Sequence, residues 1–216
     1  MRLLTLNLWN EQGPWRRRLE VLLEAIEAWA PDLICLQEVR GEGAVEQLPM
    51  LLEGLEGLGA GGWHGTFAPA QRWGGSAEGL AIISRLPLEE RRVARLPSRA
   101  SNQRLCLACR VSVDGRPLWL ATTHLAYRLG DGALREAQVE AAEAFIQRCR
   151  RPGQTTIFAG DFNATPESDE IRFLVGLHSV MGRRAFWQDA WRRCHGDEPG
   201  PTWVADNPYT EQLAWF

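Results

Sequence analysis

Lysine is absent from this chain of 216 residues, and all 24 of its cationic side chains are arginines. The formal net charge is only -3 and the isoelectric point lies near 5.9, so no overall positive field indicates a nucleic-acid or membrane-surface protein. A planar guanidinium suits phosphate well, but we interpret the pattern first as a coding bias, which would place arginine everywhere. Any anion binding must therefore depend on local clusters of arginine side chains.

Long apolar runs are also absent, since no stretch approaches the ~18 residues needed to span a bilayer. The chain opens directly on a strand-like run, without the charged start, apolar stretch and small-residue cleavage site of a secretory signal. Its five cysteines, at positions 35, 106, 109, 149 and 194, are odd in number and scattered, which argues against a disulfide framework. These features predict a reduced, cytoplasmic protein without a transmembrane segment.

Cys106 and Cys109 have the spacing of a metal-binding pair, but they lie in the strand-like run RLCLACRVSV. Positions three apart in a strand point to opposite faces, which disfavours one ion held by both thiols. We therefore expect buried thiols here rather than a zinc site.

The hydrophobic content of 45% is enough for a chain of this length to bury a sizeable core. We expect a single domain over residues 1–216, because no internal repeat, low-complexity tract or linker is visible. Several apolar runs favour strands covered on both faces, in a sandwich core or beneath helices. The predicted strands are 2–9, 32–38, 79–84, 104–113, 117–125 and 155–162.

Helical periodicity is clearest between residues 14 and 31, where Leu19, Leu22, Leu23 and Ile26 recur at the spacing of one helix face. A second helix is predicted from about 133 to 150, and a third from the Thr-Pro pair at 165–166, which resembles a cap followed by a first-turn proline. The glycine-rich stretch 58–79 is predicted to be a long loop beside the scaffold, where ligands are often met.

Four of the predicted strands end in side chains that can bind a metal or a phosphate. These are Asn7 in TLNLW, Glu38 in CLQE, His124 in TTHL, and Asp161 with Asn163 in GDFN. Each one taken alone has an ordinary structural explanation, as a turn residue, a solvated carboxylate or a core histidine. As a set at strand ends, they match hydrolysis assisted by a hard divalent cation.

The segments TLNLW, DLICLQEV, EGLAIISRLP, TTHL and GDFNATP, in this order and at these intervals, resemble the endonuclease/exonuclease/phosphatase superfamily, which includes deoxyribonuclease I. This resemblance implies an α/β fold, a two-sheet sandwich flanked by helices, and cleavage of a phosphate ester that depends on Mg²⁺ or Mn²⁺. It implies that Glu38 is the principal metal ligand, with Asn7 beside it. Asp161 would orient or deprotonate the attacking water, contributing also to the metal site, and Asn163 would position that water or the phosphate.

The same resemblance assigns three further residues. His124 would contact the scissile phosphate and become charged as negative charge builds there. Glu78 would pair with this histidine, which would raise its pKa and favour the cation. Arg104 would clamp phosphate oxygens. Independently of the family, a phosphodiester undergoing attack needs a cation, hydrogen-bond donors and an activated water.

The chain departs from the family pattern at its C-terminal end. After TWVADNPYT (202–210), the pattern normally continues to an Arg-Ile-Asp-Tyr strand and a Ser-Asp-His motif, and neither is present. We weigh a truncated chain, a chain that has lost its catalytic end, and a fold completed by another polypeptide, and we favour truncation. The final EQLAWF, with Leu213, Trp215 and Phe216, does not resemble a polar tail, although these side chains could also simply cover the core.

The substrate remains open among DNA or RNA, phospholipid head groups and sugar phosphates. Arginine clusters at 16–18, 91–92, 183–184 and 192–193 could contact nucleic acid, but for each we favour a solvated face. A competing hypothesis is a catalytically impaired module that binds metal or phosphate. An incomplete sheet would also leave an open edge through which copies could self-associate.

Overall fold

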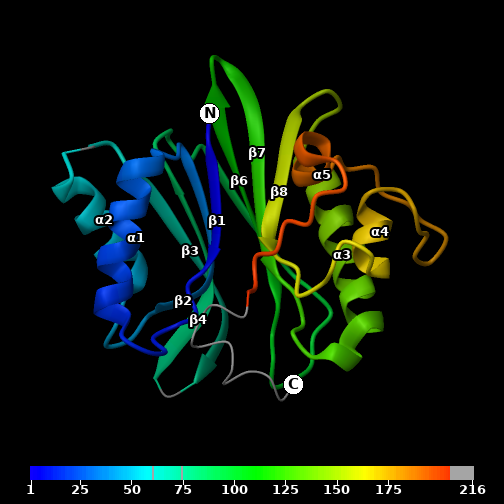
Figure 1. The fold of residues 1–216 in the computed structure, drawn as a ribbon, viewed down its shortest axis with the longest axis horizontal. Coiled ribbons are helices and arrows are strands. Elements are labelled where there is room, and N and C mark those ends of the chain that lie inside the picture. Colours follow the sequence, from blue (N-terminus) through cyan, green and yellow to red (C-terminus); the bar gives the residue numbers. More distant parts are fainter. Residues whose placement is uncertain (60, 74, 205–216) are drawn as a thin grey trace.

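Two sheets of four strands each pack face to face, and helices cover the outer face of each sheet (Figure 1). The computed structural model describes residues 1–59, 61–73 and 75–204. The strands are β1 (Leu3–Asn7), β2 (Leu33–Gly41), β3 (His64–Trp73), β4 (Ser76–Ser84), β5 (Glu90–Arg95), β6 (Leu105–Val113), β7 (Arg116–His124) and β8 (Thr155–Asp161). The helices are α1 (Trp15–Trp29), α2 (Gln47–Gly57), the 3-10 turn η1 (Leu129–Asp131), α3 (Gly132–Cys149), α4 (Asp169–Leu174) and α5 (Ala190–His195).

Each sheet contains one parallel pair of strands. The first sheet has the order β1-β2-β4-β3 and the second the order β5-β6-β7-β8, with β1 parallel to β2 and β7 parallel to β8. Parallel strands need a long crossover, and α1 and α3 supply it. The outer strands β1 and β8 lie side by side in the middle of the molecule (Figure 1). The two parallel pairs therefore meet, one from each sheet.

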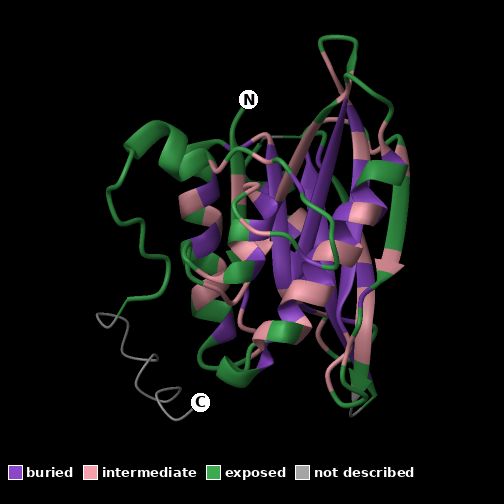
Figure 2. Cartoon of the chain, turned by 90° about the vertical axis from the view of Figure 1, so that its right-hand side faces the viewer, coloured by how far each residue is buried: buried purple, intermediate pink, exposed green. Residues whose placement is uncertain are grey.

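The apolar pattern of the strands explains this layering, because both faces of the central strands are covered. Along β2, Leu33 and Cys35 face the core between the two sheets, whereas Ile34 and Leu36 face the core beneath α1 and α2. A third core lies between the second sheet and α3. Figure 2 shows the resulting buried strands behind the helices. Alternation on two apolar faces thus produces a four-layer α/β/β/α arrangement.

The predicted fold class is confirmed: an α/β two-sheet sandwich flanked by helices. All six predicted strands occur, and the two predicted long helices form as α1 and α3. Cys106 faces the core beneath α3 and Cys109 faces the core between the sheets, so these buried thiols point to opposite sides of β6, as expected.

The predicted loop over 58–79 is wrong, because most of this stretch forms β3 and the start of β4. Two of its glycines, Gly65 and Gly79, are closely packed against neighbouring atoms. A Cβ on Gly79 would lie 1.9 Å from the carbonyl oxygen of Ala68 on the neighbouring strand. Four further elements, α2, β5, η1 and α5, were not predicted from the sequence.

The third helix begins later than expected, which corrects the role given to Thr165. Ser168 occupies the N-cap position of α4, and its backbone N–H donates to the carbonyl of Thr165 at 3.0 Å. Thr165 and Pro166 therefore belong to a turn that precedes the helix. Asp169 and Glu170 fill the first helical turn, where carboxylates interact favourably with the helix dipole.

The expectations about the end of the chain, including Leu213, Trp215 and Phe216, concern residues outside the described ranges. Among the helices that the structure does describe, none combines the length and apolar character that a membrane span requires.

Candidate active site

Four of the predicted site residues lie at, or close to, the C-terminal ends of the strands that meet at the centre of the sandwich. Asn7 ends β1, His124 ends β7 and Asp161 ends β8. Glu38 lies in a bulge of β2, where the register with β4 shifts between Leu36 and Val39. Its φ of 52° is unusual for a residue other than glycine, and such bulges re-aim side chains next to active sites.

The two carboxylates at this centre converge on one amide group. Asn7 Nδ2 donates to Glu38 Oε1 and to Asp161 Oδ2, each at 2.9 Å, while Asn7 Oδ1 accepts from the backbone N–H of Trp9 at 2.8 Å. His124 Nε2 lies 3.7 Å from Asp161 Oδ2 and 3.9 Å from Glu38 Oε1. The structure thus brings together four residues that are scattered from position 7 to position 161.

His124 is held by Arg104 from the opposite side of its ring. Arg104 Nη1 lies 2.8 Å from His124 Nδ1, and a guanidinium can only donate, so Nδ1 is the acceptor. The imidazole is therefore neutral and carries its proton on Nε2, which faces the carboxylates. Burial, and secondarily the charge of Arg104, lower the pKa of His124 to about 3.

The expected pairing of Glu78 with His124 is not what the structure has. Glu78 is buried and accepts hydrogen bonds from Asn10 Nδ2 at 2.5 Å and from Gln71 Nε2 at 3.2 Å. Arg104 occupies the position beside the histidine instead. The expected rise in the pKa of His124 becomes a fall, because burial, and secondarily the charge of Arg104, disfavour the protonated ring.

Asn163 lies beside Asp161 in a turn that follows the strand. The strand ends at Asp161, and Asn163 has a φ of 48°. Its backbone N–H donates to Asp161 Oδ1 at 3.0 Å, and its Nδ2 donates to the carbonyl of Leu125 at 3.1 Å. The turn therefore fixes the Asp161 carboxylate and links it to the residue that follows His124.

Burial dominates the electrostatics of the cleft, which is lined by Glu38, Glu78, Arg104 and His124, among others. It raises the pKa of the Glu38 carboxyl, an effect that the charges of Glu78 and Asp161 reinforce and the hydrogen bond from Asn7 opposes. It also lowers the pKa of Arg104 against the attraction of the same carboxylates. Burial thus disfavours the charged forms of both residues.

A hard divalent cation fits this donor set. Three carboxylates and one guanidinium leave the region of Glu38, Glu78, Asp161 and Arg104 with a formal net charge of -2. In the described ranges, no group of three or more histidine, cysteine or acidic side chains is placed so that it could hold a metal ion. Mg²⁺ does not need such a group, since it is usually bound by one or two carboxylates and keeps several waters.

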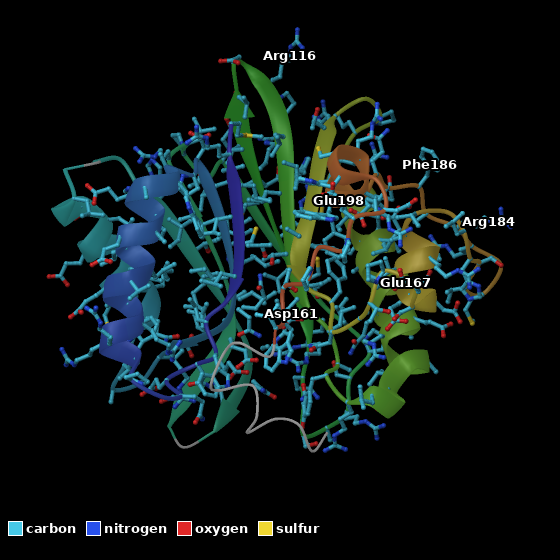
Figure 3. All side chains as sticks on the ribbon, in the orientation of Figure 1. Arg116, Asp161, Glu167, Arg184, Phe186 and Glu198 are labelled. Carbon is cyan, nitrogen blue, oxygen red and sulfur yellow. The ribbon has the colours of Figure 1, made fainter. Side chains whose placement is uncertain are left out.

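Three supporting residues were not predicted from the sequence: Asn10 and Gln71, which hold Glu78, and Gln37, which lies beneath the site. Gln37 had a usable signal, because it is the amide within the otherwise apolar run LICLQ. Of the arginine clusters considered for nucleic-acid contact, 183–184 lies away from the site, since Arg184 is at the periphery of the helical layer whereas Asp161 lies near the middle of the molecule (Figure 3).

Known proteins share this architecture. The chain is 28% identical over 183 residues to "Protein angel" of Drosophila melanogaster, covering 79% of this chain and 50% of the relative. It is 26% identical over 180 residues to "2',5'-phosphodiesterase 12" of Mus musculus, covering 73% of this chain and 30% of the relative. The catalytic domain of human Nocturnin, solved with a bound sulfate anion, superimposes with a TM-score of 0.67 at 25% identity, covering 81% of this chain and 69% of that domain.

The chain therefore spans half or less of the length of these two curated relatives. The model of the Endonuclease/Exonuclease/phosphatase family matches residues 4–211, which is nearly the whole chain. The chain belongs to the endonuclease/exonuclease/phosphatase family.

Proposed function

We propose that this chain is a divalent-metal-dependent phosphoesterase that hydrolyses a phosphodiester. The observation that supports this most directly is the Asn7 amide, which lies 2.9 Å from the carboxylates of both Glu38 and Asp161. These carboxylates come from different sheets, and beside them lies the buried pair of Arg104 and His124. One cleft thus combines an oxygen-rich site for a cation with donors for a phosphate.

Glu38 and Asp161 are the residues that would hold Mg²⁺ or Mn²⁺. Such a cation supplies charge neutralisation at a phosphoryl oxygen and lowers the pKa of a water. Asn7 organises the carboxylates rather than presenting its oxygen to the cation, because its Nδ2 faces Glu38 and Asp161 while its Oδ1 faces the Trp9 N–H. This modifies the role that the sequence suggested for Asn7.

The other residues act on water and phosphate. Asp161 is the base that accepts a proton from the attacking water, and the Asn163 N–H holds its second oxygen in place. His124 donates a hydrogen bond from neutral Nε2 to a phosphoryl oxygen, instead of acting as the expected cation. Arg104 supplies positive charge to the phosphate, and its Nε has no hydrogen-bond partner among the described residues.

A diester is favoured over a monoester by the name of one relative, "2',5'-phosphodiesterase 12". DNA or RNA would be a natural source of such a diester, whereas phospholipids and sugar phosphates are the alternatives. We also propose a reducing compartment such as the cytoplasm, since all five cysteines are free and four of them are buried.

Turnover of bis(p-nitrophenyl) phosphate with Mn²⁺ tests the proposal. We expect wild-type hydrolysis that EDTA abolishes, and a loss of at least ~100-fold in Asp161→Asn. Asp169→Asn, on the surface of α4, is the matched control and should retain activity. Failure of the wild type to hydrolyse the diester while it still binds Mn²⁺ would favour the catalytically impaired binding module instead.

A further inference from the structure

A buried amide joins the two sheets directly beneath the candidate site. Gln37 is only 1% exposed, and its Nε2 lies 3.2 Å from Thr5 Oγ1 and 3.1 Å from Thr122 Oγ1. Thr5 belongs to β1 of the first sheet and Thr122 to β7 of the second. The Cys35 thiol of β2 also hydrogen-bonds with Thr122. The interior between the sheets is otherwise mainly apolar, so these polar contacts constrain how the sheets are aligned.

The partners of Gln37 lie in register with the site residues. Thr5 precedes Asn7 by two positions and Thr122 precedes His124 by two positions, and side chains two apart on a strand share a face. Gln37 itself pairs with Asn7 across the parallel strands, and its carbonyl accepts from the Leu8 N–H at 2.9 Å. The amide of Gln37 is therefore bonded one layer below the groups that form the cleft.

Gln37 and Glu38 also form the bulge of β2, in the gap between the paired positions Leu36 and Val39. Residues in sparsely populated backbone conformations, such as Glu38 with its φ of 52°, persist only where the surroundings hold them. The side-chain bonds of Gln37 to both sheets, together with its backbone bond to Leu8, provide that restraint. They fix the direction in which the Glu38 carboxylate projects.

We propose that Gln37 is a positioning residue that sets the spacing between the first-sheet half of the site, Asn7 and Glu38, and the second-sheet half, His124 and Asp161. Through that spacing it determines the affinity of the site for a divalent cation. The inference rests on the proposed function, because it assumes that Glu38 and Asp161 share a cation. Gln37 itself touches neither cation nor substrate.

Two adjacent threonines provide a matched test. Thr122 and Thr123 are both fully buried, but Thr123 Oγ1 donates to the Leu105 carbonyl within the second sheet, so only Thr122 links the sheets. Thr122→Val and Thr123→Val remove one hydroxyl each without changing the volume much. Binding of Mn²⁺ by isothermal titration calorimetry, on variants shown to be folded by circular dichroism, is the readout. Gln37→Met removes the amide that bonds to Thr122, and so breaks the same link between the sheets from the β2 side; it serves as the second variant.

A partner bonded directly to a metal ligand is typically worth about 10- to 100-fold in metal affinity. Gln37 and Thr122 act one layer further out, so we expect a weakening of up to about 10-fold in Thr122→Val and Gln37→Met but little change in Thr123→Val. Equal Mn²⁺ affinities in the two threonine variants, or an unchanged affinity in folded Gln37→Met, would overturn the inference while leaving the proposed function intact. A wild-type chain that binds no Mn²⁺ would overturn the proposed function first, and this inference with it.

Discussion

Arg104 Nη1 lies 2.8 Å from His124 Nδ1, so a cation rather than a carboxylate orients the buried histidine of the cleft. The arrangement fixes the tautomer, with the Nε2 proton facing Asp161 and Glu38. A neutral histidine can donate a hydrogen bond at neutral pH without first acquiring a proton. The pH dependence of stability provides a direct check of this arrangement.

We predict that His124 makes the protein less stable in acid. Its folded-state pKa of about 3 lies below the ordinary value of 6.5, so the stability it contributes is complete above pH 6.5 and is lost as the pH falls toward 3. For each pH unit in this window, the free energy of unfolding changes by at most about 1.4 kcal/mol through His124. Urea unfolding in EDTA should show a shallower loss of stability between pH 6.5 and 4.5 in His124→Gln than in wild type.

The control for this experiment is His178→Gln. It removes a partly exposed histidine whose Nε2 lies 4.0 Å from Glu136 Oε2. Its pH profile should follow the wild type more closely than that of His124→Gln does. Superimposable profiles for wild type and His124→Gln would mean that the histidine is not held neutral in the folded protein.

A second prediction concerns Glu38, whose pKa is raised chiefly by burial. A raised carboxyl pKa means that stability is complete below the unfolded value and falls as the pH rises through the folded value. Without metal at pH 7, Glu38→Gln should therefore be at least as stable as wild type. With Mn²⁺ at 100 times its Kd, wild type should gain about 2.7 kcal/mol and Glu38→Gln much less.

Thermal unfolding with EDTA or Mn²⁺ measures both parts of this prediction. Glu53→Gln, an exposed change on α2, is the matched control and should gain stability from Mn²⁺ as wild type does. If Mn²⁺ stabilised Glu38→Gln as strongly as wild type, Glu38 would not be a metal ligand.

A third prediction is that copies of this chain self-associate through the strands β1 and β8. In the described ranges, each of these strands is hydrogen-bonded to a neighbouring strand on one side only. Unpaired edges with apolar side chains promote pairing between chains, and Leu3 and Leu6 of β1 are 36% and 38% exposed. Leu6→Lys should therefore reduce the association of the wild type in sedimentation velocity runs at increasing concentration.

Leu177→Lys provides the comparison, because Leu177 is 65% exposed but lies after α4, away from the sheet edges. It should leave the association unchanged. A wild type that stays monomeric at all concentrations would show that the edges are protected in solution.

A fourth prediction tests close packing within the first sheet. Gly79→Ala would place a Cβ 1.9 Å from the Ala68 carbonyl oxygen, so the paired strands β3 and β4 must separate. We expect destabilisation of at least ~2 kcal/mol, in line with the larger effects of overpacking. Gly57→Ala at the end of α2 meets no atom within 4 Å and should be neutral or stabilising by ~0.5 to 1 kcal/mol. Urea unfolding compares the two variants, and equal stabilities would refute the packing argument.

The sequence by itself determined a layered α/β architecture and the identity of most cleft residues, and the family resemblance implied that the layers include a two-sheet sandwich. Strands such as 104–113 are apolar on both faces, and that pattern admits few arrangements other than burial between layers. Likewise, Asn7, Glu38, His124 and Asp161 were recognisable because each polar side chain follows an apolar run. Such signals are visible in the sequence because strand periodicity and strand ends are properties of short segments.

Only the tertiary structure decided how those residues are paired. Arg104 rather than Glu78 faces His124, whereas Asn10 and Gln71 hold Glu78. These pairings depend on segments brought together from different parts of the chain. The strand β3 was mistaken for a loop because its stretch of the sequence is rich in glycine, and its pairing with β4, where the Ala68 carbonyl approaches Gly79, is a tertiary contact. Contacts between distant segments therefore set these pairings. They also set the pKa of His124, because its burial and its neighbouring charges exist only once the two sheets have packed together.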